Sequence, residues 1–255
     1  VVQLPVVPLI DQASPWIGGH YCDEFAESHG KELVVREAVG ASIPLAGVGC
    51  AIARDAMARL ASAHDGRPFA GGSMTEDYEM GLRLGALGER TVFVRLPPSA
   101  GEAGVVASRG HFPATLGAAV RQKARWLGGI GERWCRLRDR RGPLAALLLL
   151  SGYVAALLWG QLWLAAQLGA PLPPQPSDLL ATLLEVNFVL LLWRTLMRIG
   201  FTTRIYGLGE GLASVPRILA GNLVAILAAS RAFFIHAGGG PKQWDKTAHV
   251  FPAGV

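Results

Sequence analysis

Two adjacent carboxylates in the segment SMTED, residues 73–77, could act in acid–base catalysis. Acidic side chains in the first turn of a helix are stabilised by the helix macrodipole, and Ser73 and Glu76 have the spacing of a capping box. The segment can therefore be a purely structural helix start. A carboxylate held at such a position can also remove a proton from a nucleophilic hydroxyl, and Asp77 is the candidate for this role.

A second group of candidate residues lies in the segment RQKARW, residues 121–126. On a helix Gln122 and Arg125 share one face, and Trp126 adjoins them. The arginine guanidinium is a planar, always charged fork of donors that suits a pyrophosphate, and an indole ring offers a flat apolar surface to a sugar. The alternative is a tryptophan at a membrane boundary beside snorkelling arginines. These residues alone favour neither interpretation.

Together the two motifs resemble those of the processive family-2 glycosyltransferases, which have the GT-A fold and include the cellulose and hyaluronan synthases. The TED triplet precedes the QxxRW motif by about 45 residues, and apolar segments follow. The chain is also similar to the bacterial inner-membrane glycosyltransferases of phage adsorption over nearly its whole length. That similarity lies in VQLPV, YCDEFAESHGKEL, PLAGVGCAIAR, TEDYEMGLRLGALG, FPATLGAAVRQKARWLGGI and WDKTAHVFP.

The resemblance implies an inverting transferase that moves a sugar from a nucleotide sugar, with UDP as the expected nucleotide, to a growing glycan or polysaccharide. In such an enzyme Asp77 would be the general base, with Glu76 beside it in the catalytic site. Gln122 and Arg125 would face the nucleotide diphosphate. The tail around Lys246 and Thr247 would take the place of a gating loop that touches phosphate, although it has equally the composition of a solvated tail.

The acceptor side would be formed by four further residues. Trp126 would lie under the acceptor sugar, and Thr75 would shape the adjoining helix start. Gly47 and Gly49, in the segment AGVGC, would let the backbone approach a bulky substrate, or would simply form a tight turn. Relatives tend to carry a glutamate before Phe-Pro, where this chain has Gly-His at residues 110–111, so the resemblance does not extend to the acceptor contact of that glutamate.

The resemblance also implies a divalent metal, Mg²⁺ or Mn²⁺, that stabilises the departing diphosphate. Neither the uridine-binding strand nor the acidic metal motif of the family occurs in these 255 residues. We therefore expect the N-terminal, nucleotide-binding half and the metal ligands to lie outside this chain, which alone would be an incomplete enzyme. The alternative function is that of a non-catalytic inner-membrane component of a polysaccharide-secretion or phage-adsorption assembly, with an outer-membrane partner.

The elements that must position these residues alternate between strands and helices, which is typical of α/β folds. We expect strands at residues 1–7 and 91–96, a strand or loop at 43–49, and helices at 15–29, 54–63, 75–87 and 114–134. The resemblance implies that residues 1–142 form the C-terminal, acceptor-side part of a GT-A, Rossmann-like domain. The three cysteines are far apart and odd in number, which indicates packing roles in a reducing compartment.

The rest of the chain is predicted to be an all-α membrane region. Only 17% of the residues are charged and the mean hydropathy is +0.34, against roughly 25% charged residues in ordinary soluble domains. Residues 144–168 and 179–197 are long enough to span a bilayer. Arginine-rich flanks, including a basic belt at residues 121–141, predict cytoplasmic ends, with the proline-rich turn outside. The resemblance implies that the membrane is the bacterial inner membrane. The belt leads into the first span, which favours a lipid partner over nucleic acid.

A third apolar run, residues 212–235, contains Arg217 and Arg231. Only 13 residues separate the two arginines, too few to cross a bilayer, and they share a helical stripe opposite apolar residues. We therefore expect a helix that lies along the membrane surface; a third spanning helix with snorkelling arginines is the alternative. The predicted domains are residues 1–142, two spanning helices at 143–205, and the surface helix with a cytoplasmic tail at 206–255.

Overall fold

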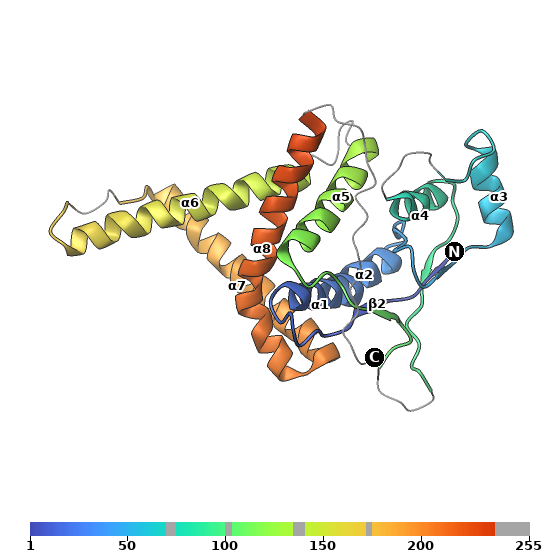
Figure 1. Cartoon of the computed structure of the whole chain (residues 1–255), viewed down its shortest axis with the longest axis horizontal. Helices are drawn as coiled ribbons and strands as arrows, with labels where there is room; N and C mark the ends of the chain where they lie inside the picture. The colour runs from blue at the N-terminus through green and yellow to red at the C-terminus, as the bar shows by residue number, and fades with distance from the viewer. Residues whose placement is uncertain (70–74, 100–103, 135–140, 172–174, 238–255) are drawn as a thin grey trace.

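The computed structural model describes residues 1–69, 75–99, 104–134, 141–171 and 175–237. Within them an N-terminal α/β part is followed by three long apolar helices, and the two regions pack together through the last two of these helices (Figure 1). The predicted order of an α/β part and an all-α membrane region is confirmed.

The strands are short and form two small sheets. Strand β1 (Val2–Gln3) pairs antiparallel with β3 (Cys50–Ala51) and parallel with β4 (Val92–Phe93). Strand β2 (Val6–Pro8) pairs in parallel with β5 (Ser108–Gly110). The predicted strand at residues 1–7 is thus two strands, because the chain passes from one sheet to the other at the intervening proline, which has no N–H for a ladder. Residues 41–46 form a loop.

Six helical segments belong to the α/β part. Helix α1 (Ile17–Glu27), the π-helical segment η1 (Ser28–Glu32) and α2 (Leu33–Ala38) follow one another without a break. Helices α3 (Arg54–Ser62), α4 (Glu76–Ala86) and α5 (Leu116–Trp134) lie close to their predicted ranges. Gly30 in η1 faces Phe201 so closely that a Cβ atom would lie 2.8 Å from the ring. The first helical stretch is therefore fitted directly against the membrane region.

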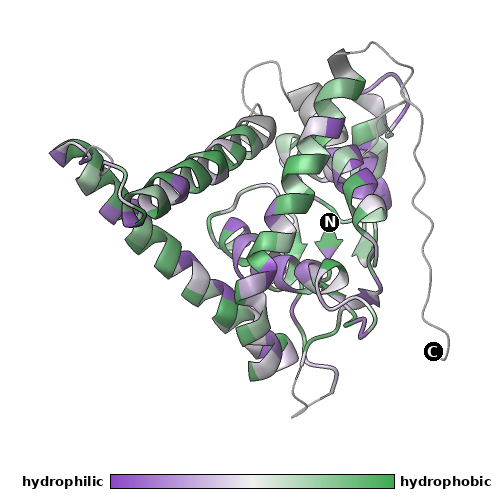
Figure 2. Cartoon of the chain, turned by 60° about the vertical axis from the view of Figure 1, so that its left-hand side comes forward, coloured by the Kyte–Doolittle hydropathy of each residue, from purple (hydrophilic) through white to green (hydrophobic). Residues whose placement is uncertain are grey.

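The three C-terminal helices are α6 (Arg141–Gln167), α7 (Asp178–Tyr206) and α8 (Leu208–Ala237). All three are long and apolar enough to cross a membrane. Helices α6 and α7 form a hairpin that projects away from the α/β part, and it is apolar along most of its length (Figures 1 and 2). Its large apolar side chains are exposed, among them Leu157, Trp163 and Phe188. The two predicted spans fall within this hairpin.

Helix α8 has two different faces, as its sequence predicts. Arg217 and Val224 are buried against the α/β part and the other long helices, whereas Leu219, Phe233 and Phe234 are exposed. In a helix that lies along a membrane surface the polar stripe would face water, but Arg217 faces helix α1, because its charge is neutralised there. Surface placement of α8 stays a prediction, since the helix also has the length of a span.

The neutralisation of Arg217 is an ion pair between α8 and α1. Its Nη1 donates to Asp23 Oδ1 at 3.1 Å, and both side chains are at most 4% exposed. A second guanidinium nitrogen is paired with Glu210. Because a buried charge without its partner is costly, this contact fixes the position of α8 on α1.

We expect Asp23→Ala to lower the free energy of unfolding by on the order of 3 kcal/mol, because Arg217 stays buried with one carboxylate fewer. The exposed Asp55 on α3 provides the control, and Asp55→Ala should change stability by about 0.5 kcal/mol or less. Thermal unfolding of the two variants in detergent measures the difference. Equal melting temperatures for both variants and the wild type would show that the pair does not hold α8.

Candidate active site around Asp77

Two glycines allow helix α4 to lie directly on the loop at residues 42–45. A Cβ atom at Gly81 would lie 2.6 Å from the carbonyl oxygen of Ile43 and 2.6 Å from the backbone nitrogen of Leu45, and one at Gly85 would collide with Ser42. A real Cβ atom does not come this close to another heavy atom, so α4 can approach the loop only with glycine at both positions. The approach brings the first turn of α4, which contains Asp77, to the end of this loop.

Asp77 and Gly47 are in direct contact. Gly47 has a φ of +71°, which is unfavourable for any residue with a side chain, and its Cβ atom would lie 2.5 Å from Asp77 Oδ2. The carboxylate therefore lies directly against the glycine backbone. The structure thus brings together two of the predicted site residues, one from the catalytic and one from the acceptor-side set.

Gln3 fixes the loop that carries Gly47. Its side chain is fully buried; Nε2 donates to the carbonyl oxygens of Leu4 at 2.8 Å and Val48 at 2.9 Å, and Oε1 accepts from the backbone N–H of Ala46 at 2.9 Å. Sequence reasoning missed this residue. The signal was a lone amide in the apolar strand VVQLPVV, since a buried polar side chain must find hydrogen-bond partners.

The Asp77 side chain is half-buried, and its neighbours act on its pKa in opposite directions. Burial raises the pKa of the Asp77 carboxyl, and the neighbouring Glu76 raises it further. The backbone N–H of Tyr78 donates to Oδ1 at 2.8 Å and, like the Arg125 guanidinium, lowers this pKa. The net effect is a pKa above the usual range of an aspartate. A raised pKa makes the carboxylate a stronger base once it is ionised.

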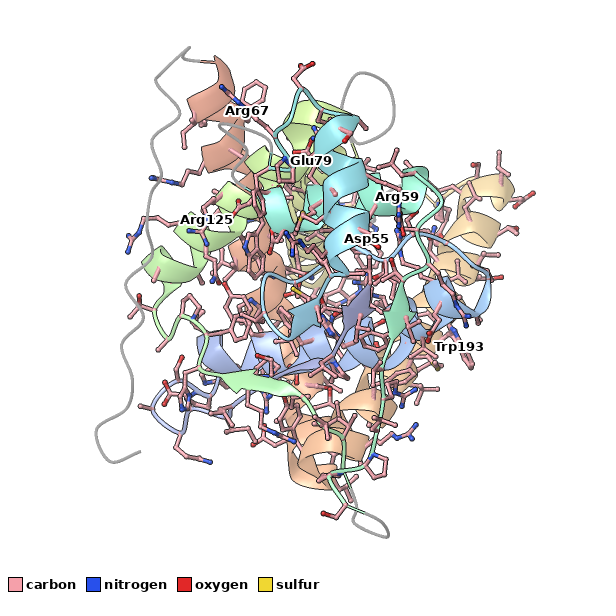
Figure 3. The ribbon with its side chains drawn as sticks, turned by 90° about the vertical axis from the view of Figure 1, so that its right-hand side faces the viewer. Asp55, Arg59, Arg67, Glu79, Arg125 and Trp193 are labelled. Carbon is pink, nitrogen blue, oxygen red and sulfur yellow. The ribbon has the colours of Figure 1, made fainter. Side chains whose placement is uncertain are left out.

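Helix α5 supplies Gln122 and Arg125, and Arg125 is labelled in Figure 3. The Arg125 guanidinium is close enough to Asp77 to lower the pKa of its carboxyl. Gln122 is only 4% exposed, and its Oε1 has no hydrogen-bond partner among the described residues. Helices α4 and α5 therefore bring the TED and QxxRW motifs together, as the resemblance implies. Binding of a diphosphate by Gln122 and Arg125 stays a prediction.

Trp126 packs inside an aromatic cluster between α5 and α1. Its ring centroid lies 6.3 Å from that of Tyr21 and 6.5 Å from that of Phe25, both in edge-on geometry, and Phe112 stacks on Tyr21 at 4.9 Å. The side chain is half-buried. This packing holds α5 on α1, and it accounts for the position of Trp126 without a contact with lipid. A role beneath an acceptor sugar stays a prediction for the remaining exposed part of the ring.

The other predicted residues have structural contacts or lie outside the described part of the chain. Gly49 has a φ of +61° and accepts a hydrogen bond from the N–H of Leu4 at 2.7 Å, so it serves a tight, paired turn. Thr75 is the N-cap of α4 and is buried. Because Glu76 is the first residue of the helix and not the third, the predicted capping box is wrong. Ser73, Lys246 and Thr247 lie outside the described residues.

The described residues do not provide a metal site. No group of three or more His, Cys, Asp or Glu side chains in these ranges is placed to hold an ion, and the pair Glu76 and Asp77 alone falls short of the ligand number that Mg²⁺ requires. The metal expected from the resemblance stays a prediction that concerns residues beyond this chain.

Comparison with known proteins relates the chain to glycosyltransferases. The model of the family "Glycosyl transferase family group 2" matches residues 1–220. The chain is 34% identical over 296 aligned positions to "Bacteriophage adsorption protein B" of Escherichia coli K12 and, to the same extent, to "Bacteriophage N4 adsorption protein B" of Escherichia coli O157:H7. The alignments cover 99% of this chain but 39% of each relative. No solved structure shows a significant match.

The contact of Gly47 with Asp77 predicts a difference between two alanine variants. Gly40 has a similar φ of +67°, but a Cβ atom there would have no neighbour within 4 Å, so Gly40→Ala should cost about 1 kcal/mol from backbone strain alone. Gly47→Ala adds the displacement of the Asp77 carboxylate, and we expect about 1–3 kcal/mol of further loss. Thermal unfolding measures both. Equal destabilisation would mean that the carboxylate does not lie against residue 47.

Proposed function

Since the chain belongs to glycosyl transferase family group 2, we propose that it forms the acceptor side of an inverting, membrane-anchored glycosyltransferase. The donor would be a nucleotide sugar, with UDP as the nucleotide, and the acceptor a growing glycan or polysaccharide. The chain spans about two-fifths of the length of the relatives that it matches, so the proposal concerns the whole protein of which such a chain is a part.

The observation that carries the proposal is the position of Asp77. Its carboxylate lies against the Gly47 backbone, has a raised pKa, and is near Arg125 on α5. In the proposed reaction Asp77 takes the proton of an acceptor hydroxyl, whose oxygen attacks the anomeric carbon of the donor. The bond from that carbon to the diphosphate breaks with inversion, and the leaving diphosphate is stabilised by Arg125, with Gln122 beside it.

The proposed location is the bacterial inner membrane, with the α/β part in the cytoplasm. Helices α6 and α7 would cross the bilayer, since their apolar side chains are exposed and their basic flanks lie at the end near the α/β part. Helix α8 packs on α1, whose Glu24 side chain is partly exposed and whose Asp23 is buried against Arg217 of α8. Charged groups of this kind do not lie in hydrocarbon without cost, which supports a position of α8 along the membrane surface.

A second candidate function is favoured by the names of the relatives, which describe phage adsorption and not a reaction. In that case the chain would belong to a non-catalytic inner-membrane component of a polysaccharide-secretion or phage-adsorption assembly, with a partner in the outer membrane. Release of free nucleotide diphosphate from nucleotide sugars by the purified whole protein separates the two. A binding component would show no turnover.

Asp77→Asn in the whole protein should lower the rate of sugar transfer by about 10²–10⁴-fold, because the acceptor hydroxyl loses its base. The affinity for the nucleotide should stay within about twofold of the wild type, since this part of the site contacts the acceptor. Steady-state transfer assays and calorimetric titration with UDP measure the two effects. Asp55→Asn, at an exposed position on α3, is the matched control, and retained transfer in Asp77→Asn would remove Asp77 from the mechanism.

The raised pKa of Asp77 sets the pH dependence. Transfer requires the carboxylate, so activity should fall as the pH decreases through a pKa above the ordinary aspartate value of 3.8. Arg125→Gln removes a positive charge that lowers this pKa. The acidic limb of the profile of kcat/KM should therefore move to higher pH in the variant, in addition to any fall in the maximum rate. An unchanged or lower midpoint would contradict the coupling of the two residues.

A further inference from the structure

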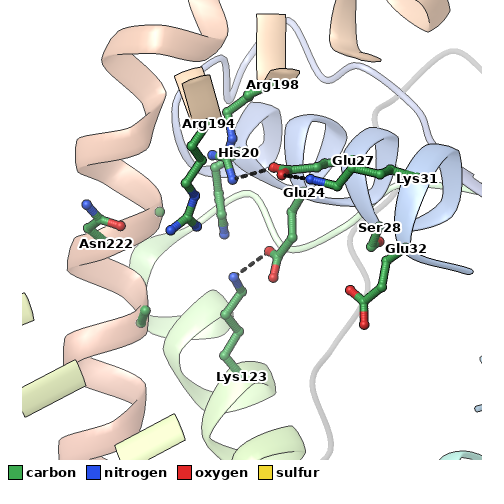
Figure 4. A pocket seen from close by; sticks show the side chains of 12 residues that line it. His20, Glu24, Glu27, Ser28, Lys31, Glu32, Lys123, Arg194, Arg198 and Asn222 are labelled. Atoms are coloured by element: carbon green, nitrogen blue, oxygen red, sulfur yellow. Dashed lines mark hydrogen bonds and ion pairs between the residues drawn. The ribbon is translucent and has the colours of Figure 1, made fainter. Parts of the chain in front are cut away.

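A polar cavity of about 330 Å³ lies apart from the Asp77 site, at the junction of the α/β part with the membrane helices. Helix α1 and segment η1 form one wall, and α5, α7 and α8 form the others (Figure 4). Its lining consists of His20, Glu24, Glu27, Ser28, Lys31, Glu32, Lys123, Arg194, Arg198, Gly221, Asn222 and Ala225. Neither of the functions considered above uses this cavity.

The lining has an excess of one positive charge. It contains four basic and three acidic side chains. Three of the basic groups are engaged in ion pairs: Lys31 with Glu27 at 2.6 Å, Lys123 with Glu24 at 2.5 Å, and Arg198 with Glu27 at 3.4 Å. Arg194 has no carboxylate within ion-pair distance among the described residues. The cavity therefore has one cation available for an anionic ligand.

His20 adds a buried acceptor without a donor. The residue is 2% exposed, and its Nδ1 is hydrogen-bonded to the carbonyl oxygen of Ile17, so Nδ1 must carry a proton. Burial, together with the Lys123 ammonium, lowers the pKa of His20 to about 4, and the ring is therefore neutral with a free lone pair on Nε2. That atom has no hydrogen-bond partner among the described residues. A ligand group that fits here is a hydrogen-bond donor.

The cavity borders the lipid-facing surface. Arg194 directly follows residues 188–193, which are six consecutive exposed apolar side chains on α7. On the opposite side Asn222 of α8 donates to the hydroxyl of Tyr153 on α6 at 2.9 Å. Both predicted spanning helices thus reach the edge of the cavity. A ligand with a polar head in the cavity could extend acyl chains along α7.

We propose that this cavity binds the headgroup of a phospholipid whose phosphodiester carries a hydroxylated group, as in phosphatidylglycerol. Arg194 pairs with the phosphodiester, and a headgroup hydroxyl donates to His20 Nε2. An ammonium headgroup fits less well, because it would add a second positive charge to a lining in which the basic side chains already outnumber the acidic ones by one. Phosphatidylglycerol also balances the excess charge of the lining, whereas zwitterionic phosphatidylethanolamine does not.

The test is a lipid titration of the purified, delipidated protein in detergent, followed by native mass spectrometry. Phosphatidylglycerol should bind more tightly than phosphatidylethanolamine and than water-soluble glycerophosphoglycerol. Arg194→Gln should weaken phosphatidylglycerol binding about tenfold, which corresponds to one charge-assisted hydrogen bond. Arg204→Gln is the matched control on the same helix, since Arg204 is exposed and does not line the cavity; its effect should stay within about twofold.

Each arm of the experiment can overturn part of the proposal. Equal losses in the Arg194 and Arg204 variants would mean unspecific attraction of anionic lipid to a basic surface. Equal affinity for glycerophosphoglycerol would make the site one for a soluble phosphodiester, and equal affinity for phosphatidylethanolamine would refute the role of His20. The comparison of lipids uses the unaltered protein, so it does not depend on the folding of a His20 variant. No readout requires transferase activity.

Discussion

The close approach of helix α4 to the loop at residues 42–47 is the constraint on which the candidate active site depends. Any side chain at Gly81 would meet the backbone of the loop, and any side chain at Gly47 would meet the Asp77 carboxylate. The contact of Gly81 with the loop and the contact of Gly47 with Asp77 therefore together determine the position of the carboxylate. Gln3 holds the loop from the other side, through hydrogen bonds that a mobile loop would not keep.

A second contact joins this α/β part to the membrane helices. The buried pair of Arg217 and Asp23 places α8 on α1, and the aromatic cluster around Trp126 places α5 on the same helix. Helix α1 is thus the common support of the helix that carries Arg125 and of the helix that we place at the membrane surface. In this arrangement the orientation of the chain in the bilayer also orients the candidate active site.

Much of this organisation could be predicted from the sequence, because periodicity and hydrophobic length are local signals. The spans, the helix after Thr75 and the helix of the QxxRW motif follow from such signals, and the family follows from motif combinations. The environment of Arg217 could not be predicted, since a stripe with an arginine looks the same whether it faces water or a distant aspartate. The role of Gln3 depended equally on partners more than forty residues away. The predicted capping box was wrong because the spacing of Ser73 and Glu76 does not determine the residue at which the helix begins.

In the proposed enzyme the backbone at Gly47 holds Asp77 in place for catalysis. The most direct measurement is the rate of sugar transfer by the whole protein carrying Gly47→Ala, compared with Gly40→Ala, which shares the backbone strain without the contact. We expect a large fall in kcat for Gly47→Ala alone, with the affinity for the nucleotide unchanged. Equal kcat values for the two variants would contradict it.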